Sequence, residues 1–269
     1  MSDFESKDAF GDFVRTVRSE RRFIFDGKAG NFIAAVRAAS KSRMHSVKSG
    51  VRLWRAQRGS LFAPENDMGI EEEHPLPVTR MIPDPKYIKN GGRANPPGFT
   101  YLYLASTKET ALAEMRPWVG ESLTLGIFEI QKNIKIVVCK AGDEDWEERL
   151  FVENPPLDKL NQYVWNDISR AFAHPVDRED QENTYVPTQI LAEAFKAEGF
   201  DGFAYRSGLE RGTNIVLFDV HAAKLIDRCR FVYTLNKVRY NFEASPNHPI
   251  RFYKDGAGEC ITEIPTESP

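Results

Sequence analysis

Three side chains in the stretch RANPPGFTYLYLASTKETALAEMRP, residues 93–117, have types and spacing that suit ligand chemistry. Arg93 precedes a proline-rich turn, Tyr103 lies in the alternating run that follows, and Glu114 lies in the next helical pattern. A guanidinium binds phosphate or carboxylate oxygens in pairs. A tyrosine ring packs on planar or cationic groups, and a partly desolvated carboxylate holds a cation or a hydroxyl. The same spacing also fits a surface arginine, a half-buried strand aromatic and a solvated glutamate.

The residues around Arg93 predict a stiff loop. Pro97-Gly98 suits the central pair of a type II turn, because glycine tolerates the positive φ that the second position needs. Pro96 and Pro97 also lower the entropy that is lost when the loop becomes ordered. We therefore expect Arg93 to be presented on a preset backbone, which suits the capture of an anion.

The strand and helix after this loop are expected to position the tyrosine and the glutamate. Residues 101–105 alternate, with the tyrosines on one face of a strand and the leucines on the other, inward-packing face. Ser106 and Glu109 fit a capping box, which predicts a helix from about 107 to 116 that ends before a proline. Winding this helix places Glu114 at the border of its apolar stripe, where a carboxylate can project into a cleft.

Apolar periodicity predicts further elements on both sides of this stretch. Helical patterns cover residues 4–22, 30–43, 155–172 and 186–200, and strand patterns cover 51–59, 123–130, 134–139, 203–206 and 214–220. Residues 60–97 form a proline-rich stretch that predicts a long irregular loop, and the acidic run at 142–148 predicts a solvated loop or helix start. The expected organisation is a helical N-terminal extension (1–50), a catalytic domain (51–245) and a C-terminal tail (246–269).

Composition narrows the class of partner and compartment. The chain has 269 residues, is 41% hydrophobic and carries a formal charge of −3, so it lacks the positive field that nucleic acid requires. Its first residues show no basic segment followed by an apolar run, and no stretch of about 18 consecutive apolar residues occurs. We therefore expect a globular cytoplasmic protein that binds neither nucleic acid nor membrane.

Neither a metal site nor a phosphate loop is predicted. The three cysteines have no CxxC spacing, and the five histidines are scattered without an HExxH pattern. The glycines near Arg93 do not fit a P-loop or G-x-G-x-x-G motif. Any anion would thus be bound by arginine side chains.

The ordered set of residues resembles the RES family, which is named for an arginine, a glutamate and a serine. Arg93 fits the family's G-R-x-N arginine, Tyr103 its strand tyrosine and Glu114 its A-x-x-E glutamate. Arg55 in LWRAQ fits an earlier arginine, and Ser207 fits the late serine before an N-[IL]-V-L-F strand. The resemblance covers about residues 51 to 220.

Two departures from the family pattern accompany this resemblance. Ala94 stands where an aromatic residue is common, and the linker from Arg58 to Gly92 is long.

The resemblance implies an α+β fold of the ADP-ribosyltransferase-like type, with a mixed β-sheet core, flanking helices and NAD as substrate without a metal. Arg93 and Glu114 would be catalytic, with Glu114 holding ribose hydroxyls and stabilising positive charge. Arg55 would bind the diphosphate together with Arg93, Tyr103 would contact the nicotinamide or its ribose, and Ser207 would orient an arginine or a phosphate oxygen. Breaking the nicotinamide–ribose bond develops oxocarbenium character, so the site needs charge placement more than a strong acid.

The acceptor of the ADP-ribose group stays open at this point. Water gives an NAD glycohydrolase and inorganic phosphate an NAD phosphorylase, the two reactions tied to the family's bacterial toxins, each with a protein antitoxin. The alternatives are a mono-ADP-ribosyltransferase that modifies a protein and a non-catalytic nucleotide-binding domain. A carboxylate-pair sugar hydrolase would need an acid such as Asp201 beside Glu114.

Overall fold

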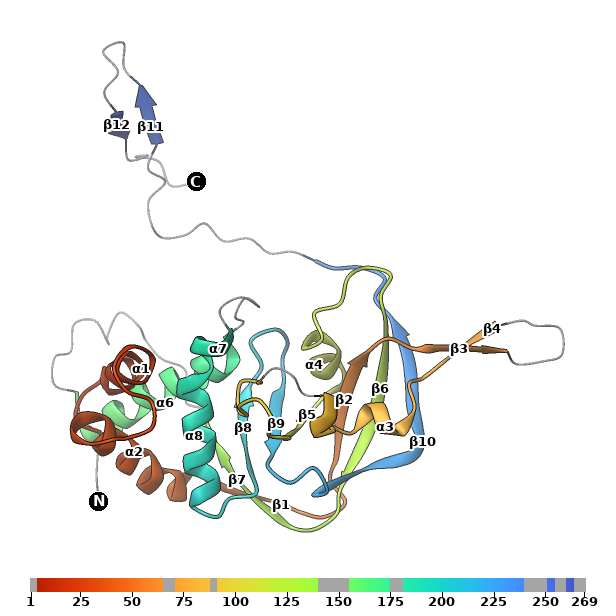
Figure 1. Ribbon diagram of the computed structural model, residues 1–269, viewed down its shortest axis with the longest axis horizontal. Helices are drawn as coiled ribbons and strands as arrows, with labels where there is room; N and C mark the ends of the chain where they lie inside the picture. Colours follow the sequence, from red (N-terminus) through yellow and green to blue (C-terminus); the bar gives the residue numbers. More distant parts are fainter. Residues whose placement is uncertain are drawn as a thin grey trace. The chain divides into compact units, whose positions relative to one another are not determined.

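A computed structural model of the chain describes residues 4–64, 71–87, 91–139, 155–174, 181–239, 251–254 and 260–263 (Figure 1). The chain divides into two compact units, Met1–Leu235 and Asn236–Pro269. In the second unit, strands β11 (Arg251–Lys254) and β12 (Cys260–Glu263) pair antiparallel. The first unit holds the sheet, the helices and every predicted site residue.

An eight-stranded mixed sheet forms the centre of the first unit. Its strand order is β1 (Met44–Val47), β7 (Ile134–Val138), β8 (Gly202–Arg206), β9 (Thr213–Leu217), β5 (Leu102–Ala105), β2 (Arg52–Arg58), β6 (Ser122–Ile130) and β10 (Ala223–Thr234). Strands β7 and β8 pair in parallel, and the other neighbours in this sheet pair antiparallel. The predicted α+β class, a mixed sheet with flanking helices, is confirmed.

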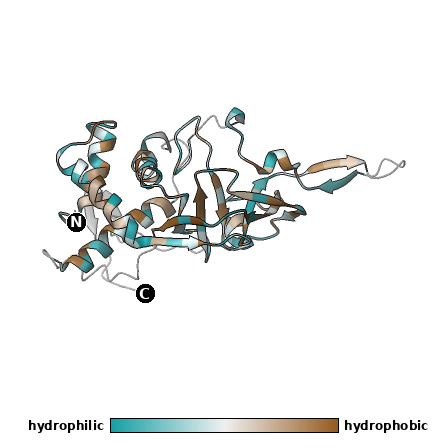
Figure 2. Cartoon of the chain, turned by 90° about the horizontal axis from the view of Figure 1, so that it is seen from below, coloured by the Kyte–Doolittle hydropathy of each residue, from teal (hydrophilic) through white to brown (hydrophobic). Residues whose placement is uncertain are grey.

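Both faces of the central strands are buried, which explains their near-continuous apolar runs. In β8, Phe203 and Tyr205 belong to one core cluster and Ala204 to the other, and in β9 Val216 and Ile215 divide in the same way. Figure 2 shows these strands as a largely hydrophobic band. In β5 the leucines pack inward as expected, but Tyr101 on the opposite face is buried too.

Four helices supply most of the core cluster that contains Phe203 and Tyr205: α1 (Ala9–Ser19), α2 (Gly27–Ser40), α6 (Leu157–Ala173) and α8 (Val186–Ala197). They gather beside β7 and β8, whereas α4 (Lys108–Ala113) packs against β2 and β5 (Figure 1). Shorter helical turns are η1 (Lys41–Arg43), α3 (Val78–Met81), η2 (Pro85–Tyr87) and α7 (Gln181–Thr184). None of the helices in the described ranges is long and apolar enough to cross a bilayer.

The N-terminal helices pack against each other through aromatic rings. Phe10 and Phe13 of α1 contact Phe32 of α2, with the Phe13 and Phe32 rings stacked at 4.7 Å between centroids. Both helices contact α8, and residues 44–47 continue as edge strand β1 beside β7. Residues 1–50 thus share one compact unit with the sheet.

The region from 60 to 97 is more regular than its prolines predict. Strands β3 (Leu61–Pro64) and β4 (Glu71–His74) form a two-stranded ribbon that projects from the sheet (Figure 1), with Leu61 opposite His74. The prediction of an irregular loop was wrong for these residues. The two strands become regular by pairing with each other, and the acidic run at 71–73 lacks the apolar alternation that indicates a strand in the sequence. The acidic run at 142–148 lies outside the described residues.

Gly202 is a point where the sheet tolerates no side chain. A Cβ there would lie 2.1 Å from the carbonyl oxygen of Val216 in the neighbouring strand. Gly202→Ala should therefore lower the free energy of unfolding by about 1–3 kcal/mol or more, since the strands must move apart. Urea denaturation measures this. The matched control is Gly11→Ala, an exposed position in α1 with nothing within 4 Å, where the change should stabilise by about 0.5–1 kcal/mol.

Candidate active site

A cavity of about 660 Å³ lies where β2, β5, α4 and the loop before Arg93 meet. Four of the five predicted site residues line it: Arg55, Arg93, Tyr103 and Glu114. The fifth, Ser207, reaches it through a hydrogen bond to Glu114. A second cavity of about 530 Å³ lies between α1 and α2 and contains none of the predicted site residues.

The loop that carries Arg93 contains the turn that its composition predicts. The amide of Phe99 donates to the carbonyl of Pro96 at 3.2 Å and Gly98 has φ of 85°, as a type II turn requires. The amide of Gly92 donates to the carbonyl of Asn95 at 2.8 Å. The loop therefore closes on itself on both sides of Asn95.

Helix α8 and strand β5 tie this loop to the core. Thr188 Oγ1 donates to the carbonyl of Arg93 at 2.6 Å, and Gln189 Nε2 donates to the carbonyl of Gly92 at 2.9 Å. The Tyr103 hydroxyl donates to Asn95 Oδ1 at 2.6 Å and accepts from the amide of Ala94 at 3.1 Å. Helix α8 therefore holds the carbonyls of Gly92 and Arg93, and Tyr103 of β5 holds the next two residues of the loop, Ala94 and Asn95.

The Arg93 side chain is 11% exposed and points to the carboxylate of Glu114. Its Nη1 donates to the carbonyl of Phe172 at 2.9 Å and lies 3.9 Å from Glu114 Oε2. Burial disfavours its charge, but Tyr205, Tyr185 and Glu114 outweigh this, so the pKa of Arg93 is raised above its ordinary value. Arg93 supplies a fixed positive charge to the cavity.

Two donors hold one oxygen of Glu114 and leave the other beside Arg93. Ser207 Oγ donates to Oε1 at 2.8 Å, and Asn214 Nδ2 donates to the same oxygen at 2.6 Å. Because the side chain is only 18% exposed, these donors fix its orientation with little competition from water. Oε2 is the oxygen that a ligand hydroxyl or a developing positive charge would meet.

The helix that carries Glu114 is shorter than expected and capped differently. It spans Lys108–Ala113, and its N-cap is Thr107, whose Oγ1 accepts from the amide of Thr110 at 3.2 Å. The predicted capping box was wrong because the Ser106 hydroxyl accepts from the amide of Thr213 in β9 instead, at 3.0 Å. Glu114 occupies the C-cap, at the end of the helix rather than on its flank.

Arg55 and Tyr103 form another wall of the cavity and contact each other. Arg55 Nε donates to the carbonyl of Met81 and Nη1 to the carbonyl of Tyr103, both at 2.9 Å. Burial lowers the pKa of Arg55 to about 10, so the side chain stays charged near neutral pH. Since the Tyr103 hydroxyl is engaged by the loop, its ring is the part that can contact a ligand.

The hydroxyl of Ser207 contacts Glu114. It donates to the carboxylate and accepts from the amide of Leu209 at 3.1 Å, which closes a tight turn after β8. Asp201 directly precedes β8, whereas Ser207 directly follows it, so the rise per residue of a strand places the two roughly 20 Å apart. The Oδ2 of Asp201 accepts from the amide of Lys135 at 2.8 Å. The structure therefore does not bring Asp201 to Glu114, as a carboxylate-pair hydrolase would require.

Three residues of the site were missed by the sequence reasoning. Asn214 contacts Glu114, and Tyr185 and Tyr205 line the cavity beside Arg93. Asn214 opens the N-[IL]-V-L-F strand motif, so its signal was present in the sequence. The two tyrosines have no local signal, because only folding brings α8 and β8 to the loop. In the described ranges, no cluster of three or more His, Cys, Asp or Glu side chains could hold a metal ion.

Buried tyrosines around the cavity predict a loss of stability at high pH. Burial raises the pKa of Tyr205 to about 12 and raises that of Tyr103 as well, above the value of about 10 for an unfolded chain. Between these values the unfolded state loses protons that the folded state retains. The free energy of unfolding should therefore stay level below about pH 10 and then fall by about 1.4 kcal/mol per pH unit for each such tyrosine.

Urea denaturation from pH 9 to 12 measures this slope. Tyr205→Phe should make it shallower, and Tyr233→Phe, at an exposed position of β10, serves as the control. An equal slope in wild type and Tyr205→Phe would contradict the assignment.

Fold and site together define an α+β domain with an arginine–glutamate cavity at a strand–helix junction. The RES domain family model matches residues 52–236, and the chain belongs to this family. No curated protein matches the chain. One chain in the crystal structure of the M. tuberculosis MbcT-MbcA toxin-antitoxin complex is 13% identical, with a TM-score of 0.37; the match covers 75% of the present chain and 96% of that one.

Proposed function

We propose that this protein consumes NAD by cleaving the bond between nicotinamide and ribose, as an NAD glycohydrolase or an NAD phosphorylase. The observation that carries the proposal is the convergence of Arg93 and Glu114, 3.9 Å apart, in one cavity with Arg55 and Tyr103. The RES family membership supports NAD as the substrate. The cavity volume of about 660 Å³ is in the range of about 300–1,000 Å³ that is usual for ligand sites of this size.

The charges of the cavity complement those of NAD. The diphosphate carries negative charge, and Arg55 and Arg93 both line the cavity. Each charge-assisted hydrogen bond to a phosphate oxygen contributes about 1.5–3 kcal/mol. The Tyr103 ring offers a face to the cationic nicotinamide or to its ribose.

Glu114 would act on the ribose at the bond that breaks. The C–N bond electrons go to the nicotinamide ring, which leaves neutral, while positive charge develops on the ribose. A carboxylate with one oxygen fixed by Ser207 and Asn214 is preorganised to stabilise that charge without rearrangement. A water molecule or a phosphate ion then attacks the ribose carbon; water loses a proton to solvent as it does so.

The proposal also includes a biological role. We propose that the protein is the toxin of a toxin–antitoxin pair acting on cytoplasmic NAD, with a protein antitoxin that covers the cavity. Depletion of NAD by the free protein and protection of NAD by a bound partner would follow. The family membership supports this role, and the partner's identity would come from proteins that copurify with the chain and block NAD turnover.

The deciding experiment incubates the purified full chain with NAD, with and without inorganic phosphate, and identifies products by mass spectrometry. Nicotinamide with ADP-ribose indicates the glycohydrolase, and nicotinamide with phosphorylated ADP-ribose, formed only with phosphate, indicates the phosphorylase. A mass increase on protein would indicate a mono-ADP-ribosyltransferase. NAD that stays intact in both arms, yet binds, would leave the non-catalytic nucleotide-binding domain and refute the proposed activity.

A further inference from the structure

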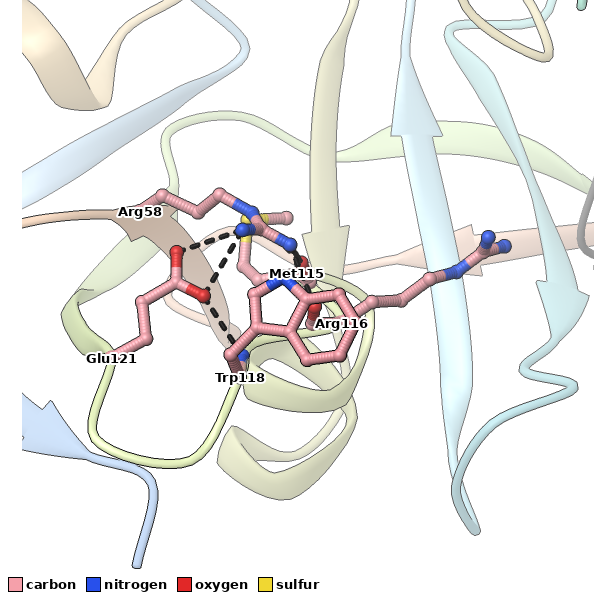
Figure 3. A network of polar contacts seen from close by, with 5 residues as sticks. All are labelled: Arg58, Met115, Arg116, Trp118 and Glu121. Carbon is pink, nitrogen blue, oxygen red and sulfur yellow. Dashed lines mark hydrogen bonds and ion pairs between the residues drawn. The ribbon is translucent and has the colours of Figure 1, made fainter. Parts of the chain in front are cut away.

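The turn that follows Glu114 is held by one side chain from the neighbouring strand, Arg58 of β2 (Figure 3). Its Nε and Nη2 donate to the carbonyl of Met115, at 3.0 and 2.6 Å, and Nη2 also donates to the carbonyl of Arg116 at 2.6 Å. Its Nη1 donates to both carboxylate oxygens of Glu121, at 2.8 and 3.0 Å. We call this arrangement of Arg58, Glu121 and the two carbonyls the turn clamp.

All three guanidinium nitrogens of Arg58 are used in the turn clamp. Nε, Nη1 and Nη2 make five hydrogen-bond contacts between them. Arg58 lines the same cavity as Arg55 and Arg93, so by position and charge it would be taken for a third phosphate-binding arginine. To bind an anion it would have to release the carbonyls or Glu121, and its charge is already balanced by that carboxylate.

Glu121 also closes the turn directly. Its Oε2 accepts from the amide of Trp118 at 2.9 Å, so one carboxylate fixes both Arg58 and the backbone three residues before it. Figure 3 shows Arg58 and Trp118 meeting at this carboxylate, while the Arg116 side chain extends away from the clamp. The backbone from 115 to 121 is therefore bound at three points by two side chains.

The backbone inside the clamp is strained. Arg116 has φ of 47°, in the left-handed region that residues with a Cβ rarely adopt. Such a conformation persists where the surroundings over-determine it, and the bond from Arg58 to the Arg116 carbonyl supplies that constraint.

The clamp acts on Glu114 through the covalent chain. Helix α4 has only six residues, too few to hold its own last turn firmly, and Glu114 is its C-cap. The first carbonyl that Arg58 binds belongs to the next residue, Met115. Ser207 and Asn214 hold the carboxylate, and Arg58 holds the backbone, so Glu114 is fixed at both ends.

We infer that Arg58 is a positioning residue: through the turn clamp it sets the place of the Glu114 carboxylate in the cavity, and it does not bind the ligand. The effect on turnover rests on the proposed NAD-cleaving function. The existence of the clamp rests on the contacts alone.

The test is kinetics and amide hydrogen exchange on Arg58→Lys, which keeps the charge but loses the planar fork. A small displacement of a reacting group lowers turnover by up to about 100-fold, so kcat for NAD should fall about 10- to 100-fold with KM within about twofold. Exchange in the peptide 114–121 should become faster. Glu121→Gln should do the same more weakly, and in the double variant kcat should fall no further than in Arg58→Lys alone, since both changes open one clamp.

The matched control lies on the same strand. Arg52 pairs with Glu129 at 3.5 Å on the surface, so Arg52→Lys and Glu129→Gln make the same chemical changes in a pair that touches neither the turn nor the cavity. Both controls should leave kcat and the exchange of residues 114–121 unchanged.

Four results would overturn the inference. A rise in KM with unchanged kcat would show that Arg58 binds substrate. An equal loss of kcat in the Arg52→Lys control would show a general structural role. A fall in kcat of Arg58→Lys that is fully explained by a lower melting temperature of this variant would show the same. If the wild type leaves NAD intact, the proposed function fails while the clamp is still decided by exchange: unchanged exchange in both Arg58→Lys and Glu121→Gln would refute it.

Discussion

In the Glu114→Gln variant, NAD cleavage is expected to fall about 10²–10³-fold in kcat, a loss of about 2.7–4 kcal/mol of transition-state stabilisation. Glutamine keeps the size of the side chain and an oxygen for Ser207 and Asn214. It removes the negative charge that, in the proposed reaction, faces the ribose when the nicotinamide leaves. Because positive charge develops only in the transition state, the change should lower kcat and leave KM for NAD nearly constant.

The control for this prediction is Glu109→Gln, the same chemical change on the same short helix. Glu109 is 57% exposed and pairs with Lys108 at 3.7 Å, outside the cavity. Its turnover should equal that of the wild type. Nicotinamide release measured by chromatography gives both rates, and unchanged turnover in Glu114→Gln would reject the role of this carboxylate.

The second large effect is expected for Arg93→Lys, which should lower kcat/KM for NAD by about 10²–10⁴-fold. Lysine keeps the charge but cannot bind the carbonyl of Phe172 and two phosphate oxygens at once. Losing two charge-assisted hydrogen bonds at about 1.5–3 kcal/mol each gives a loss of that size. Since the diphosphate does not react, most of the loss should be a higher KM.

Steady-state kinetics over a wide range of NAD concentration separates the two predictions, one in kcat and the other in KM. Arg15→Lys is the control, an arginine 71% exposed on α1 and paired with Asp12. If Arg93→Lys lowered kcat alone and left KM unchanged, Arg93 would act on the reacting bond rather than on the diphosphate.

The strongest local patterns predicted their elements well. The amphipathic pattern at 155–172 became α6 at Leu157–Ala173, since Leu160, Val164, Ile168 and Phe172, at spacings of four, face one core, while Leu157 at the helix start is exposed. Strand β10 (Ala223–Thr234) was not predicted, because charged residues and a register shift between Leu225 and Arg230 break its alternation. The ribbon β3–β4 was also not predicted, because its regular structure comes from the pairing of two segments and not from a local apolar pattern.

The site shows the same division. Arg55, Arg93, Tyr103 and Glu114 were found because they stand in an ordered motif, and the structure brings all four to one cavity. The partners that orient them were harder to find. The hydrogen bond from Ser207 to Glu114 was not predicted, and Arg58 is a positioning residue although its type and place suggest an anion ligand.

The elements with strong apolar periodicity, the turn before the strand tyrosine and the family itself follow from the amino-acid sequence, because hydrophobic period, turn chemistry and motif order are properties of neighbouring residues. The pairing of Arg93 with Glu114, the two donors on that carboxylate and the turn clamp exist only in the folded chain. They join residues as far apart as Glu114 and Asn214, and a hydrogen bond depends on ångström-scale placement by the whole sheet rather than on spacing along the chain.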